Sequence, residues 1–193
     1  MSLEHNKTIV RRYQDAYNTG NFAALAEVVA ADVLTPNIVS GLPSQRARLK
    51  EKIQAARPLP DALKQKALEA LVRLPDGDAL CHGDFHPDNI VLSQHGPVVL
   101  DWVDASSGHP LADVARTALL MQHAALPPHM PGRRLIQAGR RLWYALYLRH
   151  YSRLRSLLPR EVEAWMLPIA AARLSEGIAE EKGQLLALVW KSL

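Results

Sequence analysis

The chain has 193 residues, of which 48% are hydrophobic and 22% are charged, and its formal net charge is +4. This is the composition of a water-soluble globular protein, and no apolar run approaches the roughly 20 residues of a membrane span. The single cysteine, Cys81, excludes an internal disulfide, and no signal or transit pattern is visible, so we expect a cytoplasmic protein.

Residues 1–40 are predicted to form a separate helical segment. Asn18-Thr19-Gly20-Asn21 is typical of a helix stop followed by a new cap. Before it, apolar residues recur at spacings of three and four, as on one helix face: Ile9, Val10, Tyr13, Ala16 and Tyr17. The stretch from Asn6 to Pro36 resembles the opening helix pair of SnoaL-like domains, although their curved sheet is not present. The alternative is a helical pair that covers exposed apolar surface.

Two more helices are expected before residue 76. Ser44 is a candidate N-cap for a helix that runs to Arg57, and Pro60-Asp61 begins another that ends near Pro75. The second helix has an apolar stripe, made of Leu63, Ala67, Leu68, Leu71 and Val72.

The most informative stretch is His-Gly-Asp-Phe-His-Pro-Asp-Asn at residues 82–89, followed by Asp101-Trp102. In phosphoryl-transfer sites of the kinase type, an aspartate accepts the hydroxyl proton, an asparagine five residues on holds Mg²⁺, and a second aspartate after a hairpin holds Mg²⁺ again. Asp84, Asn89 and Asp101 have this order and spacing. The apolar runs 90–92 and 98–100 predict that hairpin, with a turn of about five residues.

Other interpretations of this stretch were weighed. Gly83 to His86 also fits the Gly-Asp-x-His step of metallophosphoesterases, but the upstream Asp-x-His and downstream Gly-Asn-His of those enzymes are absent. His82 is predicted to be a buried structural histidine bonded to backbone. Two roles stay open for His86: contact with substrate or phosphate, or packing within the loop. Asp88 and Asp104 are expected to be turn and cap residues.

These motifs give residues 41–193 a resemblance to the C-terminal lobe of the aminoglycoside phosphotransferase and choline kinase-like family, which has a protein-kinase-like fold. A further family element, Gly-Asp-Pro-x-x-Asp-Leu/Val-Ala, corresponds to residues 108–115, with His109 at the usual Asp or Asn position. The resemblance implies a base at Asp84, Mg²⁺ on Asn89 and Asp101, ATP or GTP as phosphate donor, and His86 among the cofactor-binding residues. It also implies that His82 and Asp113 support the loop.

The half of a kinase site that grips the nucleotide is not visible in this sequence. Before Gly83 the only glycines are Gly20, Gly41 and Gly77, so there is no glycine-rich loop, and no Val-Ala-x-Lys strand occurs. We therefore expect a separate N-lobe partner or a second protomer to complete the site.

The C-terminal half is predicted to be helical over residues 111–121, 133–158, 159–179 and 180–189, so the fold class is mainly α with a small β element. Nine arginines and no acidic residue lie between Asp113 and Glu161, which indicates a solvated basic face, or else a site for an anionic ligand or partner. The aromatic residues there have the three- and four-residue spacing of core packing, which argues against nucleic acid: Trp143, Tyr144, Tyr147 and Tyr151.

Three functions follow, in order of preference. The first is a phosphotransferase that phosphorylates a hydroxyl group of a small molecule. The second is a non-catalytic kinase-lobe remnant or partner-binding module. The third is an interaction or nucleic-acid module that uses the arginine-rich stretch.

Overall fold

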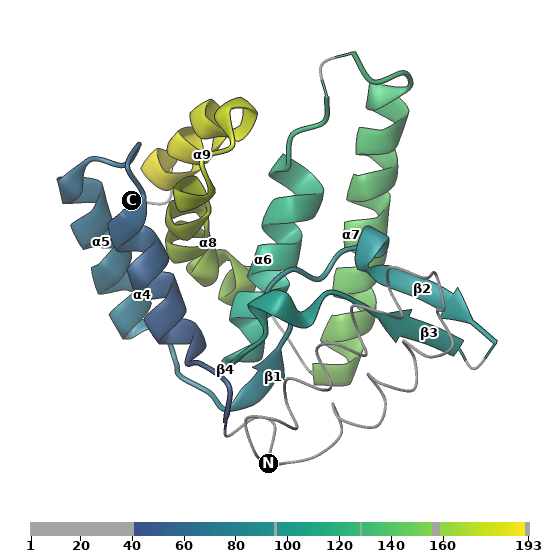
Figure 1. The fold of residues 1–193 in the computed structure, drawn as a ribbon, viewed down its shortest axis with the longest axis horizontal. Coiled ribbons are helices and arrows are strands. Elements are labelled where there is room, and N and C mark those ends of the chain that lie inside the picture. Colours follow the sequence, from purple (N-terminus) through teal and green to yellow (C-terminus); the bar gives the residue numbers. More distant parts are fainter. Residues whose placement is uncertain (1–40, 95, 128, 156–158, 192–193) are drawn as a thin grey trace, which may run out of the picture.

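The computed structural model describes residues 41–94, 96–127, 129–155 and 159–191. This part of the chain is mainly helical with two small antiparallel sheets (Figure 1), which confirms the predicted fold class at that level. The helices predicted within residues 1–40 lie outside the described residues. The elements in chain order are α4 (Gln45–Ala55), α5 (Asp61–Arg73), β1 (Ala79–Cys81), η1 (Pro87–Asn89), β2 (Ile90–Ser93), β3 (Gly96–Val99), η2 (Trp102–Asp104), β4 (Ser106–Gly108), α6 (Pro110–His123), α7 (Arg133–Arg155), α8 (Pro159–Arg173), η3 (Leu174–Glu176) and α9 (Ala179–Lys191).

The first two helices form where their caps and spacing predict. The Ser44 hydroxyl accepts the Ala47 N–H at 3.4 Å and caps α4. In α5, one face buries residues four apart: Leu63, Ala67 and Leu71. Val72 was wrongly placed on this stripe, because it lies about 100° around the helix from Leu71 and its side chain is 76% exposed.

The core is built around α8, which packs against α4, α5, α6 and α9. Figure 1 shows α8 between α4 on one side and α6 on the other. Its Trp165 and Ile169 are buried among Ile53 of α4, Val114 of α6 and Leu185 of α9. The helix predicted over 159–179 ends earlier, at Arg173, and Gly177 then adopts a left-handed conformation (φ 71°) that redirects the chain into α9.

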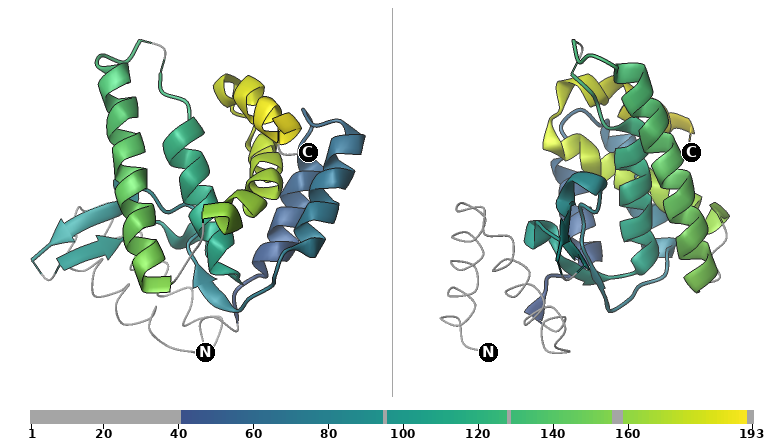
Figure 2. Two further views of the ribbon diagram at one scale, coloured as in Figure 1. Left: turned by 180° about the vertical axis from the view of Figure 1, so that it is seen from behind. Right: turned by 90° about the vertical axis from the view of Figure 1, so that its right-hand side faces the viewer.

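The two sheets hold the most informative stretch of the sequence. The predicted hairpin is confirmed as β2–β3, but its turn is shorter than predicted, because pairing continues to Ser93 and Gly96. The second sheet, which the sequence did not predict, pairs β1 with β4 and places Cys81 opposite Ser106. The segment 82–105 is therefore closed at its base by β1 and β4, and the hairpin projects from the helical body (Figure 2).

Among the described helices, none combines the length and the apolar character that crossing a membrane requires.

Candidate active site

The first turns of α6 fix the backbone of the loop at residues 82–85. The Asp113 carboxylate accepts the N–H of His82 at 2.9 Å and the N–H of Gly83 at 2.7 Å. The Thr117 hydroxyl donates to the Phe85 carbonyl at 2.9 Å. Burial raises the pKa of Asp113, while the two N–H bonds oppose that rise. The loop is thus anchored to a helix at both ends of this four-residue stretch.

His82 joins the loop to the strand that leads to Asp101. Its ring is buried, with Nε2 2.8 Å from the Leu100 carbonyl oxygen, and its Nδ1 accepts the Asp84 N–H at 3.2 Å. These two contacts assign the proton to Nε2, since a carbonyl accepts and an N–H donates. Trp102 covers the ring, with 4.6 Å between ring centroids. Both ring nitrogens therefore bind backbone.

Asp84 lies at the centre of this arrangement with a side chain that is 28% exposed. Its Oδ2 is 3.4 Å from His86 Nε2, and its Oδ1 is 3.5 Å from Arg116 Nη2. The hydrogen bond from His86 lowers the pKa of Asp84 most, burial opposes it, and the positive charge of Arg116 lowers it further. The net pKa lies below the ordinary aspartate value, so Asp84 is a carboxylate at neutral pH.

The hairpin returns the chain from Asn89 to Asp101. The Leu100 N–H donates a hydrogen bond to the Asn89 carbonyl at 2.8 Å. Asp101 follows Leu100 directly, so its backbone lies beside that of Asn89. The Asn89 side chain donates through Nδ2 to the Asp84 carbonyl at 2.9 Å, which leaves its amide oxygen as the atom that could face a metal ion. Asp101 is exposed, in a left-handed conformation with φ 59°. Within the described residues, no three acidic, histidine or cysteine side chains converge as a metal site.

A cavity of about 540 Å³ opens in front of Asp84. The loop contributes Asp84, His86 and Asp88, and the opposite walls come from the end of α6, the segment after it, α7, and the start of α9. The other lining residues are Leu120, Met121, Ala124, Ala125, Leu126, Pro127, Arg140, Arg173, Ile178, Glu180 and Glu181. None of these walls was predicted from the sequence, since they meet only through the packing of distant helices.

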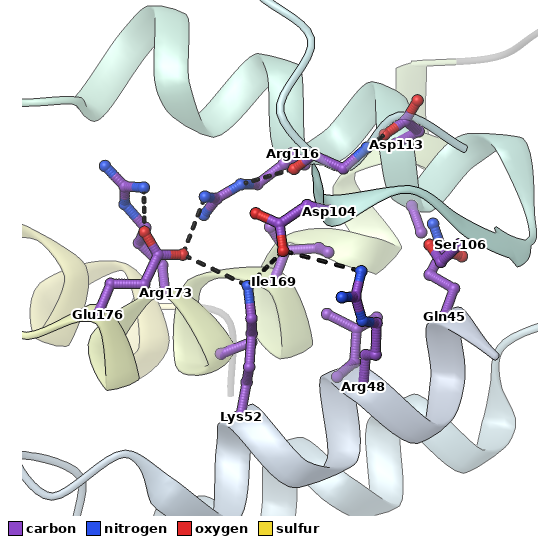
Figure 3. Close-up of a pocket in the computed structure, with 14 residues that line it drawn as sticks. Gln45, Arg48, Lys52, Asp104, Ser106, Asp113, Arg116, Ile169, Arg173 and Glu176 are labelled. Carbon is purple, nitrogen blue, oxygen red and sulfur yellow. Dashed lines mark hydrogen bonds and ion pairs between the residues drawn. The ribbon is translucent and has the colours of Figure 1, made fainter. Parts of the chain in front are cut away.

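A second, smaller pocket lies behind the loop (Figure 3), and its charged side chains pair with one another. Asp104 Oδ1 is 3.8 Å from Arg48 Nη1 and 3.6 Å from Lys52 Nζ, and Glu176 Oε1 is 2.9 Å from Arg116 Nη2. The pocket volume of about 50 Å³ has room for roughly one or two water molecules. This pocket is therefore a paired charge cluster that joins α4, α6 and η3, and it is too small for a substrate.

Arg116 is the site residue that the sequence analysis misjudged. It was counted among the nine arginines interpreted as a solvated basic face or a site for an anionic ligand or partner, yet it is buried. Besides its contacts with Asp84 and Glu176, its Nε donates to the Gly83 carbonyl at 3.3 Å. The available signal was its position three residues after Asp113, which puts both side chains on the same face of α6.

His109, which stands at the usual Asp or Asn position of the predicted family element, caps helix α6. Its Nδ1 accepts the Leu111 N–H at 3.3 Å and so caps α6, and its ring stacks on Trp165 with 5.5 Å between centroids. Burial lowers the pKa of His109. The neutral ring that this favours is the form in which Nδ1 can accept the cap bond.

An aspartate on a loop braced by a helix, with an asparagine and a second aspartate joined by a hairpin, is the arrangement of phosphoryl-transfer enzymes. The family model described as the phosphotransferase enzyme family (APH) matches residues 22–165, about three quarters of the chain. The chain belongs to this family. The match begins within the 1–40 segment, and the domain boundary at residue 40 stays a prediction. No curated protein and no solved structure matches the chain in the corresponding comparisons.

Gly83 gives the loop a conformation that other residues resist. Its φ is +82°, and an added Cβ would lie 2.6 Å from the Asp104 carbonyl oxygen. We expect Gly83→Ala to lower the free energy of unfolding by about 1–3 kcal/mol, measured by urea denaturation. The matched control is Gly183→Ala in α9, where an added Cβ meets nothing within 4 Å and should stabilise by about 0.5–1 kcal/mol. Equal effects of the two changes would contradict this account of the loop.

Proposed function

We propose that this chain transfers the terminal phosphoryl group of ATP or GTP, with Mg²⁺, to a hydroxyl group of a small molecule. The proposal rests on the position and charge of Asp84. Hydrogen bonds with Asp113 and Thr117 fix its loop, its carboxyl group is ionised, and it lines a cavity of about 540 Å³. Family membership supports phosphoryl transfer as the general chemistry. A kinase-like C-terminal lobe is the fold that we propose for residues 41–193.

The residues present suit Mg²⁺. The amide oxygen of Asn89 and the carboxylate of Asp101 are hard oxygen donors, the type that Mg²⁺ prefers, and the Leu100–Asn89 bond keeps their backbones adjacent. Mg²⁺ is commonly held by one or two protein carboxylates, with phosphate oxygens and water completing its shell. When bound, it would neutralise charge on the transferring phosphoryl group. Asn89 and Asp101 are the residues that would hold it.

Asp84 would act on the acceptor hydroxyl. Its carboxylate accepts the hydroxyl proton while the hydroxyl oxygen forms a bond to the terminal phosphorus and the bond to the leaving nucleoside diphosphate breaks. Arg116 and His86 keep Asp84 ionised, and His82 fixes its backbone, so the carboxylate needs no reorganisation before the reaction.

The acceptor would occupy the cavity in front of Asp84. Its walls combine apolar side chains of α6 with charged groups of both signs, including Asp88, Arg140 and Glu180. This mixture fits a small polar molecule that carries some apolar surface. The groups that cover the nucleotide would come from a second protomer, a separate polypeptide, or a segment beyond these 193 residues, because the sequence before Gly83 has no glycine-rich loop.

Calorimetric titration with ATP and Mg²⁺ tests this function without knowledge of the acceptor. We expect binding that requires Mg²⁺ and that weakens by at least about tenfold in Asp101→Asn, because a neutral amide is a poorer magnesium ligand. The control is Asp78→Asn, an exposed aspartate just before β1 that should bind as the wild type does. Absence of binding, or equal binding by both variants, would favour the non-catalytic alternative.

A further inference from the structure

Helix α7 attaches to the rest of the described structure by one face only. None of its 23 residues is buried, and it packs lengthwise against α6 at the edge of the molecule (Figures 1 and 2). The attached face carries Trp143 and Tyr147, whose ring centroids lie 6.2 and 5.8 Å from that of Phe85 in the loop at residues 82–85. This aromatic contact places α7 directly beside the candidate active site.

The opposite face of α7 is apolar along its first three turns. Leu135, Leu142 and Leu146 are 78%, 63% and 47% exposed, and their spacing of seven and four residues puts them on one line along the helix. Between them lies Gly139, where an added Cβ would meet nothing within 4 Å, so another backbone could approach closely. We call Leu135, Leu142 and Leu146, with the arginines described next, the α7 outer face.

The α7 outer face is strongly cationic. The sequence of α7 holds seven arginines and no acidic residue. Arg134 and Arg141 lie on one side of the leucine line, about 100° around the helix from it, and Arg149 and Arg153 continue the line toward the end of the helix. Of the ion pairs between described residues, none involves an arginine of α7.

This charge pattern selects among possible occupants. A second copy docked face to face would bring two arginine-rich helices together without a compensating acidic group on either. A helix that lies in a membrane surface carries its arginines on the face opposite its apolar residues, whereas here Arg149 and Arg153 stand on the same line as the leucines. A helix with leucines followed by acidic residues matches both parts of the face.

We propose that the α7 outer face docks an acidic amphipathic helix of a partner protein. The partner's apolar residues would cover Leu135, Leu142 and Leu146, and its carboxylates would pair with Arg141 and Arg149. This inference is independent of the proposed phosphotransferase activity. Because the inner face of α7 contacts Phe85 and supplies Arg140 to the cavity, an occupied outer face would lie one helix away from the site.

The test uses the full chain and a labelled synthetic helix in fluorescence anisotropy. The probe is an acidic peptide of about 20 residues with leucines at i, i+3, i+4 and i+7 and glutamates beside them, and its matched control has lysine at every glutamate position. We expect the glutamate peptide alone to bind, with an affinity that falls as salt rises. Leu142→Asp and Arg141→Glu should each weaken binding by at least about tenfold.

The same two substitutions, leucine to aspartate and arginine to glutamate, at exposed positions outside α7 serve as controls. Leu92→Asp changes an exposed leucine on β2, and Arg73→Glu changes an exposed arginine at the end of α5, and both should bind the peptide as the wild type does. Circular dichroism melts should match for all four variants, because each replaced side chain is exposed. Unchanged affinity in Leu142→Asp, or equal binding of the lysine peptide, would overturn the proposal. So would a dimer, or attachment to anionic lipid vesicles, that is lost in Leu142→Asp.

Discussion

Asp84→Asn is expected to lower the rate of phosphoryl transfer by about 10²- to 10⁴-fold, the usual contribution of a positioned general base. The amide keeps the size of the side chain but cannot accept the hydroxyl proton as a carboxylate does. The loop should keep its shape, because its anchors are the bonds of Asp113 and Thr117 to backbone groups, which do not involve the Asp84 side chain. The measurement is coupled nucleotide turnover over a panel of hydroxylated small molecules.

Asp78→Asn should leave this rate unchanged, since Asp78 is an exposed aspartate outside the loop. The pH dependence gives a second readout. Because the pKa of Asp84 is lowered, its protonation should not reduce the wild-type rate until the pH falls below the ordinary aspartate value. The same lowered pKa means that ionised Asp84 stabilises the fold above that value, and this contribution is lost as the pH falls through the folded-state pKa. A turnover rate that is equal in Asp84→Asn and wild type would exclude Asp84 as the base.

Much of the site could be predicted because its residues are close in sequence. The hairpin follows from two short apolar runs, and its antiparallel pairing is enough to bring Asp101 back beside Asn89. The exact turn length was not predictable from these runs, because the pairing of Ser93 with Gly96 carries no hydrophobic signal. The local sequence pattern therefore predicted which residues the hairpin brings together, while the roles of Asp84, Asn89 and Asp101 stay predictions.

The groups that tune and enclose the site could not be predicted in this way. Arg116 looks in the sequence like one more arginine of a basic stretch, and only the folded structure shows that its side chain joins Asp84 to Glu176. The β1–β4 pairing depends on three-residue strands that are too short to have a clear period. The cavity walls from α7 and α9 are brought together by long-range helix packing, which a local pattern does not specify.

The second large effect concerns the buried ion pair between Arg173 and Glu181 in the wall of the cavity. Arg173 donates through Nε and Nη2 to the two carboxylate oxygens of Glu181, at 2.8 and 3.0 Å, and through Nη1 to Glu176. The Arg173 and Glu181 side chains are only 10% and 4% exposed. Arg173→Met should lower the free energy of unfolding by about 3–5 kcal/mol, because it leaves a buried carboxylate without its counter-charge. Urea unfolding followed by tryptophan fluorescence measures this loss. Lys64→Met, which breaks the surface pair with the fully exposed Asp61, should lower it by less than about 1 kcal/mol.

The double variant Arg173→Met with Glu181→Leu separates charge from packing. It removes both charges of this pair, while Glu176, the other partner of Arg173, keeps its ion pairs with Arg116 and Lys52. The double variant should therefore recover more than half of the stability lost in the single variant, with a remainder of about 1 kcal/mol for the Ala125 N–H that loses its acceptor. Burial alone raises the pKa of Glu181, and the bonds from Arg173 and the Ala125 N–H outweigh it in the wild type. Without Arg173 the pKa should rise, so the deficit of the single variant should be largest near neutral pH and should shrink as acid protonates Glu181. A deficit that does not change with pH would mean that Arg173 stabilises the fold through its packing and not through its charge.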